Sequence, residues 1–213
     1  MNAALILLER ADKLDGYETA CRQSPINSLA RRFCQYIPWP DQSLAKKIES
    51  SFSNIRVIIL SPSADGGMPH TRAPNIICLP AYFPEEKISE TIRHELVHLS
   101  QRQNPERWRK RLLASGWTPV SEYDLPEYLV QRTRINPDTY DARFWAWEGR
   151  YVPMPLFERE DKPDLREISV RWWDMKEERL QTHQPTSFTQ IHGTLSTSQI
   201  EHPFELFAYE DSA

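Results

Sequence analysis

Residues 91–100 read Thr-Ile-Arg-His-Glu-Leu-Val-His-Leu-Ser, and this short stretch determines what we expect of the rest of the chain. His94 and His98 are four positions apart, and Glu95 directly follows the first histidine. On an α-helix, positions i and i+4 share one face and lie about one turn apart. Both imidazoles can therefore bind one metal ion from the same side, with Glu95 within reach of a metal-bound water.

The residues around this stretch predict a helix that is packed on more than one side. Apolar residues recur at helical spacing, at Ile88, Ile92, Leu96 and Leu99, and Val97 points in another direction. A proline and two glutamates at 84–86 favour a helix start, and an Asn-Pro pair at 104–105 favours its end. Zinc-dependent hydrolysis requires this arrangement, so we expect a zinc peptidase. The alternative is a surface helix on which the same residues are only solvated.

The composition is that of a soluble globular protein whose 213 residues can bury a sizeable core. The formal net charge is -4, and this mild acidity gives no argument for binding nucleic acid or a membrane surface. We therefore expect neither as a partner. One domain over residues 1–213, or one domain with a large insertion, is the expected organisation.

Cysteine usage and the N-terminus predict a reducing compartment. The three cysteines are odd in number and lack the spacing of metal-ligand pairs, at Cys21, Cys34 and Cys78. This argues against a disulfide framework. The apolar run at 1–8 has no basic residue before it and charged residues directly after it, which predicts an amphipathic helix and not a signal peptide. No apolar run approaches the length of a membrane span. We expect a cytoplasmic protein, or one exported without a Sec-type signal.

Three helices are expected before the first strand. In each of them, apolar residues recur near helical spacing. The first helix contains Ala4, Leu5, Leu8 and Leu14. The second starts at Ser24 and contains Leu29, Phe33 and Ile37, and the third starts at Asp41 and contains Leu44, Ile48 and Phe52. Apolar runs at 55–60 and 75–80 predict strands, separated by a polar, turn-rich loop at 61–74. The second strand is expected either to form an exposed cleft edge that pairs with an extended peptide or to lie inside a small sheet.

The sequence changes in character in its second half. A helix with several basic residues is expected at 106–113, with its charges solvated rather than bound to phosphate. Residues 118–197 are rich in Pro, Trp and Tyr, and we expect them to form an insertion or subdomain. Within them, residues 143–152 predict a β-hairpin with Gly149 in the turn, and residues 168–172 predict a further strand. The aromatic side chains favour packing over lining a substrate groove.

A last helix is expected within 200–210, with Pro203 as its first residue. This helix is important because a catalytic zinc usually takes three protein ligands and a water, and the motif supplies only two. The extended metzincin motif would need Gly at 101 and His at 104. This chain has Gln101 and Asn104, so that subclass is not expected.

The motif at 94–98, together with a later helix that reads Glu-Leu-Phe-Ala at 205–208, resembles the gluzincin group of zincin metallopeptidases. In that group the third ligand is a glutamate from a downstream helix, commonly followed three residues later by a small residue, here Ala208. The resemblance implies one Zn²⁺ per chain, held by His94, His98 and Glu205. It also implies an α+β fold: a zincin-like metallopeptidase core with N-terminal helices, a small mixed sheet and an aromatic-rich β insertion before the last helix.

Four other residues remain open as the third ligand because zinc accepts both imidazole and carboxylate: His192, His202, Glu201 and Glu210. His202 could instead cap the last helix, and His192 lies in a Gly-Thr-Ser-rich segment that is typical of a surface loop. His70 and His183 have no supporting context.

The expected activity is that of a zinc-dependent metalloendopeptidase acting on proteins or peptides. Glu95 would accept a proton from the zinc-activated water and pass it to the leaving amine. The negative intermediate needs a hydrogen-bond donor, for which Tyr209 is the first candidate, followed by Tyr151 and His192. Two alternatives stay open. One is an inactive zincin-like binding module that uses the basic cluster near Arg107 and the aromatic region, and the other is a non-peptidase metal hydrolase.

Overall fold

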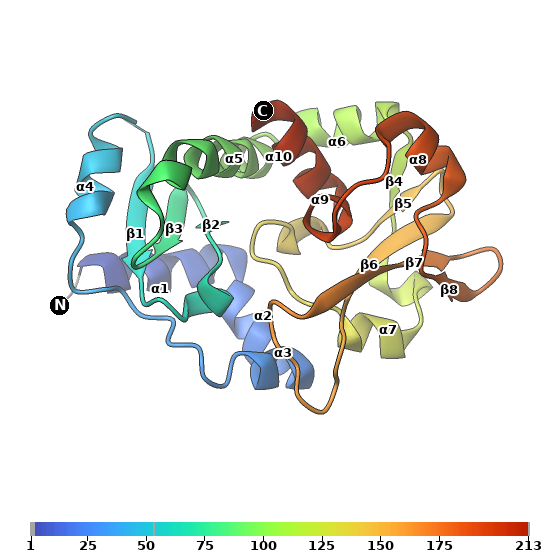
Figure 1. The fold of residues 1–213 in the computed structure, drawn as a ribbon, viewed down its shortest axis with the longest axis horizontal. Helices are drawn as coiled ribbons and strands as arrows, with labels where there is room; N and C mark the ends of the chain where they lie inside the picture. Colours follow the sequence, from blue (N-terminus) through green and yellow to red (C-terminus); the bar gives the residue numbers. More distant parts are fainter. Residues whose placement is uncertain (1–2, 53, 213) are drawn as a thin grey trace.

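The computed structural model describes residues 3–52 and 54–212 and has an α+β architecture with two β-sheets. Figure 1 shows the smaller sheet towards one end of the long axis and the larger sheet towards the other. Helices α5 (Glu85–Gln103) and α10 (Pro203–Ser212) pack against each other between them. Within the described ranges, no helix is long and apolar enough to cross a membrane.

The first sheet has three strands in the order β1-β3-β2. β1 (Arg56–Leu60) pairs in parallel with β3 (Ile76–Pro80), and β2 (His70–Arg72) pairs antiparallel with the other side of β3, so the sheet is mixed. The strands predicted at 55–60 and 75–80 are confirmed. Because β3 is the central strand, the expectation of an exposed edge at 75–80 is wrong, and the alternative of an interior strand is confirmed.

β2 lies within the segment that the sequence predicts to be a loop, next to a 3₁₀ turn, η1 (Ala64–Gly67). All three residues of β2 are polar, and all three are buried. A search for apolar alternation therefore cannot detect this strand. Its burial depends on partners from other elements, which the local sequence does not show.

The N-terminal region forms four short helices: α1 (Ala3–Asp15), α2 (Tyr17–Gln23), α3 (Pro25–Ala30) and α4 (Ser43–Glu49). The first and third predicted helices correspond to α1 and α4. The second helix is predicted to reach Ile37 but ends at Ala30, and Phe33 is 85% exposed. Pro38 disfavours helical backbone at the residue before it. Trp39 then donates a backbone hydrogen bond to β1 (2.8 Å), so the chain here runs along the sheet.

α5 begins and ends where its flanking residues predict, and α6 (Pro105–Ala114), the predicted basic helix, follows directly. Ile92 and Leu99 on α5 are buried in a cluster with apolar residues of β1 and β3. Val97 packs instead against the aromatic cluster of the second half. The prediction of a helix packed on more than one side is confirmed.

The second sheet is an antiparallel meander in the order β4-β5-β6-β7-β8. Its strands are β4 (Trp117–Pro119), β5 (Trp145–Trp147), β6 (Tyr151–Phe157), β7 (Ile168–Asp174) and β8 (Arg179–Gln181). The predicted hairpin is confirmed, because β5 and β6 are joined through Glu148 and Gly149, whose φ values are 53° and 63°. Positive φ at both central residues is what the favoured two-residue turn requires. The strand predicted at 168–172 is confirmed as part of β7.

The remaining short elements are α7 (Glu127–Arg132), α8 (Thr186–His192), α9 (Thr197–Ile200) and the 3₁₀ turns η2 (Glu122–Asp124) and η3 (Tyr140–Ala142). Phe144 and Trp173 belong to one buried cluster of this half. A second cluster joins other aromatic residues to α6, α8 and α10: Trp108, Trp117, Trp145, Trp147, Trp172, Phe188, Phe204 and Phe207. They serve packing, as the sequence favours. α10 is therefore held between this cluster and α5.

Arg72 on β2 is completely buried, and α1 supplies its counter-charge. Its Nε and Nη2 atoms donate to the two carboxylate oxygens of Asp15, both at 2.9 Å. Burial alone would raise the pKa of Asp15, but Arg72 outweighs burial and holds the pKa below its usual value. Because Asp15 is the last residue of α1, this bridge fixes the first helix on the edge strand of the first sheet.

We predict that Arg72→Met lowers the free energy of unfolding by about 3–5 kcal/mol, because it leaves Asp15 as a buried charge without a counter-charge. Arg22→Met is the matched control. Arg22 also pairs with an aspartate, Asp12, at 3.2 Å, but its side chain is 63% exposed, so a loss below about 1 kcal/mol is expected. Urea unfolding followed by circular dichroism measures both variants. Equal losses would contradict a stabilising role for the buried bridge.

Candidate metal centre

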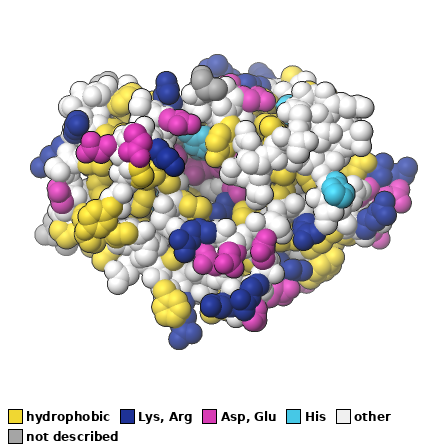
Figure 2. Space-filling view, viewed as in Figure 1, with side chains coloured by type: hydrophobic (Ala, Val, Ile, Leu, Met, Phe, Trp, Pro, Cys, Tyr) yellow, Lys and Arg dark blue, Asp and Glu magenta, His cyan; other side chains and the backbone are white. Residues whose placement is uncertain are grey.

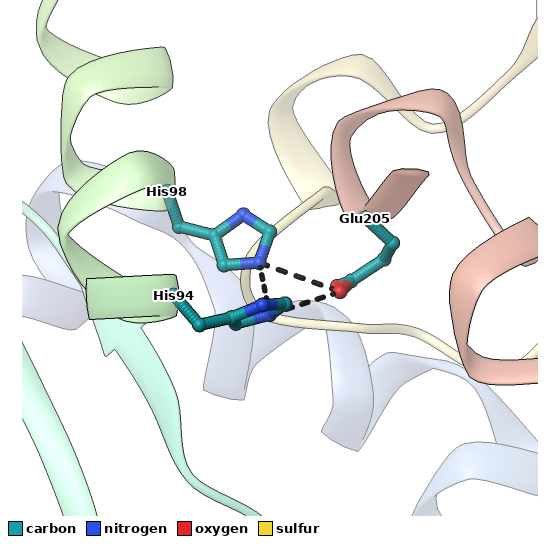
Figure 3. A group of neighbouring side chains, drawn as sticks. All are labelled: His94, His98 and Glu205. Carbon is teal, nitrogen blue, oxygen red and sulfur yellow. Dashed lines mark hydrogen bonds and ion pairs between the residues drawn. The ribbon is translucent and has the colours of Figure 1, made fainter. Parts of the chain in front are cut away.

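His94 and His98 on α5 meet Glu205 on α10, and the three side chains point toward one another (Figure 3). The Nε2 atoms of the two histidines are 3.1 Å apart. Glu205 Oε2 lies 3.3 Å from His94 Nε2 and 3.4 Å from His98 Nε2. His98 and Glu205 are buried, and His94 is partly exposed. The structure thus brings together the three residues that the sequence singles out as ligands.

These separations fit a tetrahedral zinc site. Zn²⁺ binds imidazole nitrogen and carboxylate oxygen at about 2.0–2.1 Å, so two donors of a tetrahedron lie about 3.3 Å apart. The observed separations of 3.1, 3.3 and 3.4 Å are all close to that value. Two imidazoles and one carboxylate are also a donor set that catalytic zinc sites use, with the fourth position kept for water.

Gln101 fixes the position of the proton on His98. The Nε2 atom of Gln101 donates to the backbone carbonyl of Phe204 on α10 (2.9 Å), so the Oε1 atom faces the other way. Oε1 lies 2.8 Å from His98 Nδ1 and accepts a hydrogen bond from its N–H group. A neutral His98 therefore carries its lone pair on Nε2, which faces Glu205. The lone pairs of His98 Nε2 and of the Glu205 carboxylate therefore face each other unless a proton or a cation lies between them.

The charges of the group favour a cation at this point. Burial alone would lower the pKa of His98, but the carboxylates of Glu205 and Asp138 outweigh burial and raise the pKa to about 10. Burial alone would raise the pKa of Glu205, but His98 and His94 hold it well below its usual range. A metal ion replaces the proton that His98 otherwise binds. The donor set therefore fits Zn²⁺ in charge as well as in distance.

Glu95 lies beside these residues, as the motif predicts, and borders the same cleft. It is only 3% exposed, and its Oε2 atom has no hydrogen-bond partner among the residues that the structure describes. Burial raises the pKa of Glu95 well above its usual value, and the carboxylate of Asp138 raises it further. A buried carboxylate oxygen without a partner costs free energy in a purely structural residue. The same environment suits a group whose task is to accept a proton.

A cleft of about 420 Å³ opens beside the three side chains. The face of α5 that carries His94 forms one wall, and the C-terminal segment that contains α9 and α10 forms another, through Ser198, Glu201, Glu205 and Tyr209. Residues 68–70 and 134–138 border the rest, so the first sheet contributes through β2 and not through β3. Figure 2 shows histidine and acidic atoms inside a hollow between the two halves.

Tyr209 lies one turn beyond Glu205 and is 38% exposed. Its ring meets the ring of His94 edge-on, with the centroids 4.7 Å apart. Burial raises the pKa of Tyr209, so the phenol keeps its proton at neutral pH and can donate a hydrogen bond into the cleft. The two other candidate donors lie elsewhere. Tyr151 packs under the guanidinium of Arg150, and His192 packs against Trp147 and Phe188.

The alternative third ligands are engaged in other contacts. Glu201 pairs with Arg134 at 2.5 Å. His202 Nδ1 accepts a hydrogen bond from the backbone N–H of Phe204 (3.0 Å), so it caps α10, and burial lowers its pKa to about 4. Glu210 lies 3.5 Å from His192. Of these residues, only Glu201 borders the cleft, and within the described ranges the metal-type group consists of His94, His98 and Glu205.

The two histidines without sequence context differ in position. His183 is exposed. His70 on β2 borders the cleft, but both of its ring nitrogens are used: Nε2 contacts the Tyr36 hydroxyl at 2.6 Å, and Nδ1 contacts the Met68 carbonyl at 3.1 Å. His70 therefore helps to build the cleft wall.

Sequence reasoning missed the residues that orient the ligands. Asn136 Nδ2 donates to Glu205 Oε1 (2.9 Å) and to Glu201 Oε1 (2.5 Å), which leaves Glu205 Oε2 directed at the histidines. No signal marks Asn136, because it is remote in sequence from both helices. Gln101 does carry a signal, because position i+3 from His98 lies on the same helix face.

We predict that Gln101→Met weakens zinc binding by about 10- to 100-fold, because His98 loses the acceptor that fixes its tautomer. Competition with a chromophoric chelator measures the affinity. Gln103→Met, at an exposed position at the end of the same helix, is the matched control and should bind zinc like the wild type. Unchanged affinity in Gln101→Met would exclude an orienting role for this amide.

No family model matches this chain, and neither a curated protein nor a solved structure matches it. The function of the site must therefore follow from the chemistry of its own residues.

Proposed function

We propose that this chain is a zinc-dependent metalloendopeptidase of the zincin type with a gluzincin-like ligand set. One observation carries the proposal: donor atoms of His94, His98 and Glu205 converge from two helices, and Glu95 lies unpartnered beside them. Two imidazoles and a carboxylate converge there in a largely buried space. A hydrolytic metal site requires both the ligand group and the free base.

Zinc held by these residues would lower the pKa of its water towards neutrality and polarise the carbonyl of a peptide bond. Glu95 accepts the proton of the attacking water through its free Oε2 atom and passes it to the leaving amine nitrogen. Its raised pKa brings it closer to the neutral range in which a general base works best. Gln101 and Asn136 hold the ligands in place through the cycle.

Tyr209 supplies the hydrogen-bond donor in this proposal. Its hydroxyl stabilises the negative oxygen that develops as water adds to the carbonyl. The cleft opens on the molecular surface in Figure 2, which supports entry of an extended peptide or protein segment from solvent. We propose proteins or peptides as substrates, and no role in binding nucleic acid.

The compartment is part of the proposal. All three cysteines are free, and Cys21 and Cys78 are buried. Free cysteines in a folded domain are typical of a reducing environment. We propose that the chain acts in the cytoplasm, or is exported without a Sec-type signal.

We predict that Glu95→Gln binds one zinc per chain, like the wild type, and loses cleavage of fluorescent casein by about 100-fold or more. Inductively coupled plasma mass spectrometry gives the zinc content, and fluorescence release gives the rate. Glu90→Gln removes an exposed carboxylate from the same helix and is expected to keep both properties. Retained cleavage in Glu95→Gln would remove Glu95 as the base. A wild-type protein that binds no zinc would contradict the whole proposal.

We predict that Tyr209→Phe lowers kcat by about 100- to 1,000-fold with little change in KM or zinc content, because its hydroxyl acts only on the developing charge. Steady-state kinetics on a peptide found in the casein digest separate the two constants. Tyr151→Phe is the control, since Tyr151 stacks with Arg150 away from the cleft. A loss confined to KM would assign Tyr209 to substrate binding instead.

A further inference from the structure

We infer that Asp138 forms a subsite for a positively charged group of the substrate, a primary ammonium or a guanidinium, beside the metal centre. The inference rests on the proposed function, because it assigns a role to another side of the same cleft. Asp138 is neither a zinc ligand nor the base nor the hydrogen-bond donor in the proposed function, although its carboxylate lines the same cleft.

One oxygen of the Asp138 carboxylate is fixed by the first sheet. Oδ1 accepts hydrogen bonds from the backbone N–H and from the hydroxyl of Thr71 on β2, both at 2.6 Å. Thr71 is completely buried. The backbone N–H of Asp138 in turn donates to Asn136 Oδ1 (2.9 Å). The carboxylate is therefore held in the cleft wall by the fold, unlike an acid on a free surface side chain.

The other oxygen, Oδ2, is free. It accepts no hydrogen bond from the described residues, and no Lys or Arg nitrogen among them lies within 4.0 Å of the carboxylate. Two other acids that border the cleft do have such partners. Asp65 pairs with Arg31 at 3.0 Å, and Glu201 pairs with Arg134 at 2.5 Å. Asp138 is only partly exposed, and its carboxylate lies at the wall of the cleft without a Lys or Arg partner among the described residues.

Asp138 is also close to the proposed reacting centre. It lines the same cleft as His94 and Glu95. Both of those residues belong to α5, whereas Asp138 belongs to the segment 134–138 on another side of the cleft. Glu95 Oε2, buried and unpartnered, independently marks this cleft as a place for a ligand. A substrate group next to the scissile bond comes within reach of Asp138.

The free Oδ2 atom of Asp138 favours a cationic substrate group. Hydrogen bonds from ammonium or guanidinium to a carboxylate are about twice as strong as neutral ones, and a partly buried charge is screened less than an exposed one. An acidic substrate group would be repelled. Because Asp138 already occupies the N–H of Thr71, a peptide strand cannot pair with β2 at that position. Recognition at this wall therefore depends on charge and not on strand pairing.

The test measures peptide binding to zinc-loaded Glu95→Gln, which should not cleave its ligand. The probes are acetyl-Ala-Ala-Lys-Ala-Ala-amide, the same peptide with norleucine in place of lysine, and penta-alanine amide with a free N-terminus. We expect one of the two cationic peptides to bind roughly 10- to 100-fold more tightly than the norleucine peptide in isothermal titration calorimetry. Preference for the lysine peptide assigns the subsite to a side chain, and preference for the free N-terminus assigns it to the α-ammonium.

Asp138→Asn, made in the same background, keeps an oxygen for Thr71 and removes the charge. We expect it to abolish the preference while leaving zinc content and Tm unchanged. Glu90→Gln is the matched control, because it removes a carboxylate that also borders the cleft but is exposed. It should keep the preference.

Three results would overturn the inference: equal affinity for all three peptides, no measurable binding of any of them, or a preference that survives Asp138→Asn. Each would leave the proposed function intact if the wild type holds one zinc and cleaves casein in a Glu95-dependent way. A protein without zinc or cleavage would refute the proposed function separately.

Discussion

The amide of Gln101 is the contact on which the site depends. It joins two elements that are 103 positions apart in the sequence, because it donates to the backbone of Phe204 on α10 while it accepts from His98 on α5. The Gln101 amide thus contacts α10 and also fixes the tautomer of His98. Ala208, three residues after Glu205 on the same helix, is completely buried. With the Gln101 amide changed, His98 would lose the acceptor that fixes its tautomer.

The interior of this chain otherwise follows a simple rule of charge. Buried or partly buried carboxylates are each paired with an arginine: Asp15 with Arg72, Asp65 with Arg31, Glu201 with Arg134 and Asp174 with Arg150. The rule fails only around the cleft, where Glu95, Glu205 and Asp138 have no such partner among the described residues. Uncompensated carboxylates are costly, and proteins keep them mainly where they act on a ligand. The exceptions therefore define the region in which we place the metal, the base and the cation subsite.

Local sequence predicted the parts of the structure that depend on local physics. The limits of α5, the turn at Gly149 and the start of α10 at Pro203 follow from capping, positive φ and helix-start preferences. The sequence also singled out Glu205 by its resemblance to a two-helix ligand pattern. It could not reveal β2, whose polar residues are buried only because α1 and the segment 134–138 supply partners. Asn136 and Asp138 stayed hidden for the same reason, since their roles depend on contacts across the fold. The second predicted helix was too long, because a backbone bond to β1 outweighs helical spacing after Ala30.

The placement of the ligands on α5 and α10 has a consequence for the chain as a polymer. The whole five-stranded sheet lies between these helices in the sequence. An ion bound to both would act as a cross-link that closes a loop of this length, and long loops are those whose closure costs the unfolded chain the most entropy. Because the unfolded chain has no such site, zinc binding would be coupled to folding. The resistance of the protein to heat and proteolysis would then rise with the free zinc concentration around it, whether or not a substrate is present.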